Sequence, residues 1–301
     1  MQRRATLKGL FAIFLWSSIV GLIKSVSDGV GPVAGAALIY SASAVILAFT
    51  VGLPKLNAFP RAYLVLGSTL FVLYELCLSL SLGFTHTPQQ AIEVGMVNYL
   101  WPGMTIGLTV LVYRQKVSLL MIPGLLLAVL GICRVLAADR GLSWHDMSKN
   151  VMDNPLSFGL ALCGAMIWAI YCVVTKKMAQ GCNGITLFFA LTALALWLLF
   201  LLSPQPLVAP SPRTWICLAF AALAMGGGYA AWNTGILHGN VTLLAAASYF
   251  IPVLSALLAA VMLQTPLSFS FWQGTAMVSV GSLLCWWSTR TAPPLRSETS
   301  A

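Results

Sequence analysis

Residues 184–203 of the chain read GITLFFALTALALWLLFLLS, a run without a charged side chain. A helix needs about 20 mostly apolar residues to cross the hydrocarbon core of a bilayer, so this run predicts a membrane-spanning helix. Comparable runs recur along the chain, separated by short gaps that often contain Gly, Pro or Asn. We expect ten such spans, at residues 5–25, 33–53, 61–84, 89–112, 117–137, 156–178, 184–203, 213–237, 241–263 and 268–289.

The composition of the 301 residues fits a membrane protein, because 59% are hydrophobic and only 8% are charged, against about 25% charged residues in a soluble domain. The net charge of +9 does not indicate nucleic-acid binding, since Lys and Arg lie in the short gaps between apolar runs. The seven cysteines form no C-x-x-C pair and the three histidines are scattered, so we expect no disulfide and no metal site. No phosphate-loop, nucleotide or G-x-S-x-G fingerprint occurs, and we expect no cofactor.

The charges between the spans predict their orientation. Cytoplasmic segments are expected to be rich in Lys and Arg, and this excess arises if the N-terminus lies inside. We read the basic N-terminus and Gly9–Val20 as the first span rather than a signal peptide, because more spans follow at once. Both termini are then cytoplasmic, with Arg3, Arg4, Lys8, Lys55, Arg61, Arg114, Lys116, Lys176, Lys177, Arg290 and Arg296 inside against Lys24, Arg134, Arg140, Lys149 and Arg213 outside.

The two halves of the chain match each other at a nearly constant offset of about 150 residues. Each half has five expected spans, an odd number, so the second half must be inserted upside down relative to the first. Inverted repeats are typical of secondary transporters, whose substrate sites lie near the membrane midplane between the repeats. The matching residues are Trp16 and Trp168, Lys24 and Lys176, Tyr99–Pro102 and Tyr249–Pro252, Ser118 and Ser268, Gly124 and Gly274, and Gly131 and Gly281.

The sequence therefore predicts an all-α membrane protein of ten transmembrane helices in two inverted five-helix repeats. We expect the first repeat at residues 1–137, a polar periplasmic linker at 138–154, the second repeat at 155–290 and a disordered cytoplasmic tail at 291–301. Pro102 and Pro252 are expected mid-helix at matching positions, where the missing backbone donor kinks a helix. Such kinks either act as hinges that shape a cavity or serve packing alone.

Two acidic residues fall within apolar spans, where a charge is costly and usually faces a cavity or a partner. Glu75 lies deep in the third span and is a candidate for a substrate ammonium or a coupling proton, or else for a packing role. Glu93 lies nearer the expected outer interface. Aromatic and amide residues also cluster inside the spans and could line a cavity for a flat apolar group. The candidate substrate-binding residues are Trp16, Glu75, Asn98, Tyr99, Trp101, Trp168, Tyr171, Tyr229, Trp232, Asn233 and Tyr249.

Several longer stretches carry a family resemblance. The chain resembles the drug/metabolite transporter (DMT) superfamily, in the branch with two EamA-type five-helix repeats, and within it the exporters of aromatic amino acids. The resemblance covers residues 1 to about 290. The stretches that carry it are LWSS at 15–18, QAIEVGMVNYLWP at 90–102, NGIT at 183–186, YAAWN at 229–233, GILHGNVT at 235–242 and LSFSFWQG at 267–274.

The resemblance implies a basket-like bundle around a central cavity in a bacterial inner membrane, with the fifth and tenth spans outside it. It also implies export of Phe, Tyr and Trp, which we expect to occur in a monomer by alternating access, as the two halves of the sequence rock against each other. Two other functions stay open. One is export of flat organic cations or other metabolites, and the other is a membrane-embedded enzyme or assembly factor. An enzyme would need a paired nucleophile and base inside the spans, and the sequence offers few ionisable residues there.

Overall fold

The computed structural model describes residues 2–113, 118–137, 144–204, 206 and 208–288. The described residues form helices and connecting turns. Six helical segments are long and apolar enough to cross a membrane, and a seventh is added when the bent pair at residues 2–30 counts as one span. The chain is thus a multi-pass membrane protein. These six segments are Pro32–Thr50, Arg61–Gly83, Pro88–Tyr113, Pro155–Met178, Ile185–Leu202 and Pro212–Gly235.

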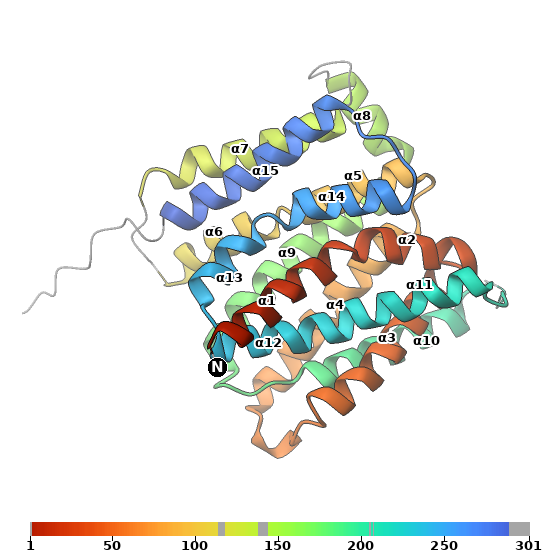
Figure 1. The fold of residues 1–301 in the computed structure, drawn as a ribbon, viewed down its shortest axis with the longest axis vertical. Helices are drawn as coiled ribbons and strands as arrows, with labels where there is room; N and C mark the ends of the chain where they lie inside the picture. The colour runs from red at the N-terminus through yellow and green to blue at the C-terminus, as the bar shows by residue number, and fades with distance from the viewer. Residues whose placement is uncertain (1, 114–117, 138–143, 205, 207, 289–301) are drawn as a thin grey trace, which may run out of the picture.

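The helices follow one another along the chain with short connections (Figure 1). Those of the N-terminal part are α1 (Gln2–Ser17), α2 (Ile19–Val30), α3 (Pro32–Thr50), η1 (Leu56–Ala58), α4 (Arg61–Gly83), α5 (Pro88–Asn98), α6 (Trp101–Tyr113) and α7 (Met121–Leu136). The others are α8 (Trp144–Asp153), α9 (Pro155–Met178), α10 (Ile185–Leu202), α11 (Pro212–Ala222), the π-helical turn η3 (Leu223–Gly227), α12 (Gly228–His238), α13 (Val241–Ser248), α14 (Ile251–Met262) and α15 (Phe269–Ser288).

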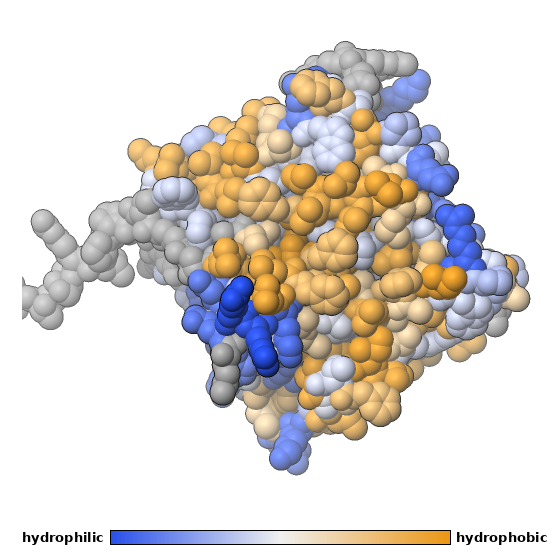
Figure 2. All heavy atoms as spheres, in the orientation of Figure 1, coloured by the Kyte–Doolittle hydropathy of each residue, from blue (hydrophilic) through white to orange (hydrophobic). Residues whose placement is uncertain are grey.

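The distribution of apolar and polar residues on the surface is that of a protein embedded in a lipid bilayer. Figure 2 shows a broad apolar band across the molecule, with hydrophilic residues gathered at its two sides. One of these sides carries the N-terminus (Figure 1), and we call it the terminal end of the bundle. The other, which we call the opposite end, carries the α4–α5 turn and α8. Large apolar side chains such as Phe49, Leu201 and Leu202 are more than three-quarters exposed, as expected where lipid replaces water.

Several consecutive helices continue one another across a break. Helices α1 and α2 meet at Ser18 with a bend of 42°. The hydroxyls of Ser17 and Ser18 donate to the carbonyls of Ile13 and Leu15. They thereby supply hydrogen bonds to main-chain carbonyls around the break. Because a membrane interior offers no water to the backbone, side-chain donors of this kind are what makes an interruption tolerable there.

The two matching prolines lie at such breaks. Helix α5 ends at Asn98 and α6 begins at Trp101, while α13 ends at Ser248 and α14 begins at Ile251. Pro102 and Pro252 are therefore each the second residue of a helical segment that follows a short break, although α5 and α6 together still form one span, Pro88–Tyr113. In the first turn of a helix a residue needs no backbone donor, so proline fits there without losing a hydrogen bond.

The tightest helix pair is α7 with α15, which lie side by side along one edge of the bundle (Figure 1). Glycines allow the two backbones to touch. A Cβ atom added at Gly274 would lie 2.6 Å from the carbonyl oxygen of Gly131, and one at Gly281 would lie 2.6 Å from that of Gly124. This small-residue packing is a common way for membrane helices to associate closely.

The remaining helices form two groups that mix the two halves of the sequence. Helices α4, α5, α6 and α9 pack on one another, and we call them bundle A. Helices α1, α2, α11, α12, α13 and α14, with η3, pack on one another as bundle B. Helices α3 and α10 pair beside both groups. The expected tail at 291–301 and residues 138–143 of the expected linker lie outside the described residues.

The rest of the expected linker is largely helical, because α8 covers Trp144–Asp153. This helix is tied to α5 and to the end of α4. The Asn150 amide donates to Glu93, the Gln90 amide donates to Asp153, and the Asn154 amide donates to the carbonyl of Phe84. Glu93 is 5% exposed and also accepts a hydrogen bond from Gln89. It is thus a buried part of this connection.

Candidate functional site

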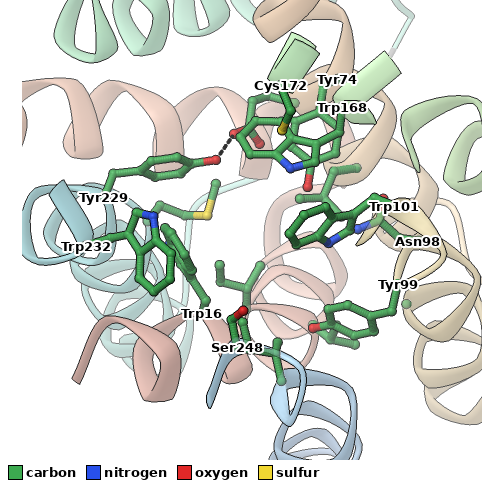
Figure 3. A pocket seen from close by; sticks show the side chains of 17 residues that line it. Trp16, Tyr74, Asn98, Tyr99, Trp101, Trp168, Cys172, Tyr229, Trp232 and Ser248 are labelled. Carbon is green, nitrogen blue, oxygen red and sulfur yellow. Dashed lines mark hydrogen bonds between the residues drawn. The ribbon is translucent and has the colours of Figure 1, made fainter. Parts of the chain in front are cut away.

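A cavity of about 220 Å³ lies between bundles A and B. Figure 3 shows aromatic side chains facing one another across it, with Trp16, Tyr229 and Trp232 on one side and Tyr74, Trp101 and Trp168 on the other. Most of its lining is apolar or aromatic, as is usual for sites that bind small molecules. The lining residues are Trp16, Ile19, Val20, Tyr74, Glu75, Leu78, Gly95, Asn98, Tyr99, Trp101, Trp168, Cys172, Met225, Tyr229, Trp232, Ser248 and Ile251.

Interrupted helices supply much of this lining. Trp16 lies just before the break between α1 and α2, and Tyr99 lies in the break between α5 and α6. Ser248 ends α13 beside the third break, and Met225 belongs to the π-helical turn η3. Substrate sites of secondary transporters are often built from such discontinuous helices. The continuous helices α4 and α9 supply the rest of the bundle A wall.

Trp16 is the centre of the bundle B wall. Its ring lies 5.0 Å from that of Tyr229 and 5.2 Å from that of Trp232, within the usual range for aromatic pairs. The indole fits because position 228 is glycine. A Cβ atom at Gly228 would lie 2.7 Å from Trp16 Nε1, so any larger residue would push the ring away from its present place.

Trp168 is the centre of the bundle A wall. Its ring lies 4.4 Å from that of Tyr74 and 6.2 Å from that of Trp101. Behind it, Tyr171 stacks at 5.0 Å with an interplanar angle of 28°. These contacts fix the indole plane, so the cavity presents two positioned tryptophans, one from each bundle.

Glu75 is the one acidic residue of the lining, and it is fully buried. Its carboxylate accepts hydrogen bonds from Tyr40 (2.5 Å) and Tyr229 (3.0 Å), and Ser79 donates to the Tyr40 hydroxyl. The bond from Tyr229 is drawn in Figure 3. Since Tyr229 belongs to bundle B and Glu75 to bundle A, this hydrogen bond joins the two bundles at the level of the cavity.

Two polar atoms of the lining lack a partner. Within the described residues, Trp16 Nε1 and Asn98 Oδ1 are buried and make no hydrogen bond. A buried polar group without a partner costs about 1–3 kcal/mol, so such groups usually have a reason to be there. One is a donor and the other an acceptor.

The structure brings most of the sequence-predicted site residues together. Trp16, Glu75, Asn98, Tyr99, Trp101, Trp168, Tyr229 and Trp232 line the cavity. The other three do not. Tyr171 lies behind Trp168, Tyr249 packs 6.3 Å from Trp286, and Asn233 is half-buried on α12 outside the lining.

Sequence reasoning missed several lining residues, among them Tyr74, Cys172, Met225 and Ser248. A signal for one of them was present. Cys172 follows Trp168 by four residues and therefore lies on the same face of a helix. Ser248 and Met225 carry no such signal, because their place depends on where the helices break.

The two ends of the cavity differ. Toward the opposite end, α2 packs on α4 and α5, and α14 packs on α5. A Cβ atom at Gly95 would lie 2.9 Å from Val20, and the Lys24 ammonium donates to the Thr85 carbonyl at 2.7 Å. Toward the terminal end, α1, α12 and α13 pack together and α6 packs on α9, but no extensive packing joins these two groups in the described part of the chain. The cavity is thus closed at the opposite end.

An apolar helical bundle with interrupted helices around an aromatic cavity is the arrangement in which many membrane transporters hold their substrates. The model of the EamA-like transporter family matches residues 156–287. The aromatic amino acid exporter YddG of Salmonella typhimurium is 58% identical over 96% of this chain and 99% of its own, and that of Escherichia coli is 57% identical over the same shares. The chain therefore belongs to the EamA-like transporter family, beside these exporters.

Two more distant comparisons agree. The aromatic amino acid exporter YddG of Ancylobacter novellus is 29% identical over 84% of this chain and 87% of its own. One crystal structure of a protein with 23% identity has a TM-score of 0.68 and covers 96% of this chain and 99% of its own. At that identity the likeness concerns the fold alone.

Proposed function

We propose that this protein exports the aromatic amino acids Phe, Tyr and Trp across the bacterial inner membrane by alternating access. The observation that carries the proposal is the cavity between Trp16 and Trp168, closed at one end and walled by aromatic rings. The names of the relatives from Salmonella typhimurium and Escherichia coli support the same substrate class. Transport by these relatives also argues against an enzymatic role.

The arrangement in the membrane that goes with this function has ten spans. In it α1 with α2, α5 with α6, α11 with α12, and α13 with α14 each form one interrupted span, and α7 and α15 are the fifth and tenth. Both termini then face the cytoplasm, so the terminal end is the inner side and the opposite end is the outer side. The residues 1–137 and 155–290 are the two inverted repeats, joined by the periplasmic segment 138–154, and a monomer is sufficient.

The moving parts of this proposal are bundles A and B rather than the two halves of the sequence. Each bundle takes spans from both repeats, because α9 of the second half packs in bundle A and α1 and α2 of the first half pack in bundle B. The closed opposite end and the separate inner groups correspond to a state that takes up substrate from the cytoplasm. Tilting one bundle against the other would close the inner end and open the outer one.

The chemistry of the cavity suits an aromatic amino acid. Its volume of about 220 Å³ is below the roughly 300–1,000 Å³ of sites for drug-sized ligands, so it fits a smaller molecule. The ring would stack among Trp16, Trp101 and Trp168, where offset and edge contacts are favourable.

Glu75 has a positioning role and does not bind the substrate directly. Both of its oxygens already accept hydrogen bonds from tyrosines. It therefore positions Tyr229, and it links the two bundles in the state that is open inward. A Glu75→Gln variant with full transport and an unchanged pH dependence would remove Glu75 from the mechanism.

Export of flat organic cations is the second candidate, and one observation favours it. The cavity lining contains one carboxylate and neither Lys nor Arg, and aromatic faces attract cations. Competition distinguishes the two. In vesicles that contain the purified protein, an excess of unlabelled Trp should suppress the flux of labelled Phe, and an excess of a flat dication should not. The reverse order of potency would favour the cation exporter.

A further inference from the structure

Two sets of residues, each spaced by four, run along the cavity. In each set a tryptophan comes first, a small or β-branched residue second and a lysine third. The first two members of each set line the cavity. The sets are Trp16, Val20 and Lys24 on α1 and α2, and Trp168, Cys172 and Lys176 on α9.

The two sets are related by one offset, since 168 − 16, 172 − 20 and 176 − 24 all equal 152. Helix α2 carries its lysine toward the opposite end of the bundle, and α9 carries its lysine toward the terminal end. Each lysine thus lies one helical turn beyond a residue of the cavity wall, Val20 or Cys172, but at different mouths.

Lys24 stands at the closed mouth. Its side chain is almost fully buried, with 3% of the residue exposed. The ammonium donates at 2.7 Å to the Thr85 carbonyl, which belongs to the α4–α5 turn of bundle A, and at 2.7 Å to Asp28 one turn further along α2. A lysine in an apolar bundle is costly, so this placement must be stabilised by these bonds. The bond to Thr85 joins the two bundles and helps to close this mouth.

Lys176 lies near the end of α9, one turn beyond Cys172, and its surroundings differ from those of Lys24. It is exposed, and its ammonium lies 4.9 Å from the centre of the Tyr113 ring at the end of α6, within its own bundle. Within the described residues, no hydrogen bond or ion pair joins Lys176 to bundle B. The lysine at the closed mouth is thus fixed to the other bundle, whereas the one at the open mouth can meet a ligand.

The Lys24 ammonium now binds a carbonyl of the α4–α5 turn. The corresponding turn for Lys176, after closure of the inner mouth, is the α12–α13 turn. The Thr87 side chain caps the start of α5 by accepting a hydrogen bond from the main-chain N–H of Gln90. The Asn240 side chain caps the start of α13 in the same way, by accepting from the main-chain N–H of Leu243. The α4–α5 turn and the α12–α13 turn thus lead into the two helices that break before Pro102 and Pro252. By this correspondence, the main-chain carbonyls next to Gly239 would be the counterpart of the Thr85 carbonyl if the inner mouth closed in the same way.

The substrate explains why two cations would alternate in this way. An amino acid carries a carboxylate, and the cavity lining contains no lysine or arginine to meet it. The nearest repeat-related cations are one turn beyond the wall at each mouth. A charge-assisted hydrogen bond is the usual partner of a carboxylate.

We propose that Lys24 and Lys176 are repeat-related carboxylate-binding residues at the two mouths of the cavity. The lysine at the open mouth binds the carboxylate of the amino acid, and the lysine at the closed mouth holds a main-chain carbonyl of the other bundle. Lys176 receives the substrate from the cytoplasm, and Lys24 meets it when the outer mouth opens. This inference rests on the proposed function, since it needs a substrate with a carboxylate.

The test compares the two sides of the membrane. In everted vesicles the cytoplasmic side faces the medium, and in right-side-out vesicles the outer side does. The readout is the ratio of half-saturating concentrations of phenylalanine and phenylalaninamide, which lacks the carboxylate. We expect Lys176→Met to weaken the preference for the carboxylate about tenfold in everted vesicles only, and Lys24→Met to do so in right-side-out vesicles only, as for one lost charge-assisted hydrogen bond.

The matched control is Lys177→Met, because Lys177 is an exposed neighbour on the same helical turn but outside the spacing of four. It should leave the preference unchanged on both sides, and Lys24→Arg should restore much of what Lys24→Met loses. Equal losses for phenylalanine and its amide, or the same change in Lys177→Met, would overturn the proposal while the exporter function stands. Absence of any aromatic amino acid flux in the unmodified protein would overturn both.

Discussion

The α7–α15 pair and the walls of the cavity are built on opposite principles. In the pair, glycines on each helix let one backbone lie on the other, and a Cβ atom at Gly131 would lie 2.7 Å from the carbonyl oxygen of Gly274. In the cavity walls, the helices break at Ser18 and at Leu100, and large aromatic rings pack edge to face. Polar atoms of Trp16 and Asn98 lack hydrogen-bond partners there. Close packing resists deformation, whereas broken helices with unsatisfied groups favour movement and binding.

This difference predicts which property of the protein a substitution in each region should change. Substitutions between α7 and α15 should change stability and leave substrate preference alone. Substitutions in the cavity walls should change transport and substrate preference more than stability.

Gly274→Leu should destabilise the protein most, because its side chain has no space between α15 and the backbone of α7 at Gly131. Overpacking of this kind costs about 1–3 kcal/mol and sometimes more. Thermal melting of the detergent-purified protein measures it. The control is Gly159→Leu, because a Cβ atom there meets nothing within 4 Å. If both variants melt at the same temperature, the pair is not the rigid element described above.

Glu75→Leu should reduce transport strongly and lower the melting temperature, because the hydroxyls of Tyr40 and Tyr229 lose their acceptor. The Tyr229 hydroxyl is then left without a partner, which costs about 1–3 kcal/mol, whereas the Tyr40 hydroxyl still accepts from Ser79. Adding Tyr40→Phe and Tyr229→Phe to Glu75→Leu should recover part of the stability, because both tyrosine hydroxyls are then removed and the Ser79 hydroxyl alone loses its acceptor. Transport should stay low. A triple variant that melts no higher than Glu75→Leu alone would argue against this network.

Gly228→Ala should alter substrate preference with little loss of stability. Its Cβ atom would lie 2.7 Å from Trp16 Nε1, so the indole must shift and the shape of the cavity changes. We expect the half-saturating concentration of the bulkier Trp to rise about tenfold and that of Phe to rise less. Gly227→Ala is the matched control, because its Cβ atom meets only the side chain of Leu223 at 3.1 Å. Equal changes for both substrates would show that Trp16 does not set the width of the site.

Cys172 gives the smallest expected effect. Its side chain lines the cavity, so a maleimide supplied from the terminal end, which the proposed function places at the cytoplasmic face, should label it and slow transport. Saturating Phe should slow the labelling several-fold, and Cys172→Ser should abolish the sensitivity. If Phe supplied at the outer face slows the labelling of Cys172 as strongly as Phe supplied at the inner face, the cavity is not closed at its outer end.

The sequence predicts the apolar helices well because apolarity is a property of a whole segment, as in residues 184–203. It predicts the faces of these helices less well. Trp168 lines the cavity and Tyr171, three residues later, lies behind it, a difference set by how α9 is rotated against its neighbours. Tyr249 and Ser248 are adjacent, yet only Ser248 lines the cavity, because α13 ends between them.

The breaks themselves are only partly visible in the sequence. Pro102 and Pro252 mark two of them, but the bend at Ser18 has no proline, and its serines bond carbonyls of the preceding turn. The mixing of both halves in bundles A and B depends on long-range packing, which no local pattern reports. The helix in the polar segment before Asn154 was likewise not visible in a search for apolar runs.

The central claim is that the cavity carries aromatic amino acids across a membrane. The most direct measurement is the flux of radiolabelled phenylalanine in liposomes that contain the purified protein, with and without a pH gradient. The account predicts a saturable flux that Trp and Tyr compete, and any response to the gradient would report the coupling to protons. A folded preparation that gives no flux above that of empty liposomes would contradict it.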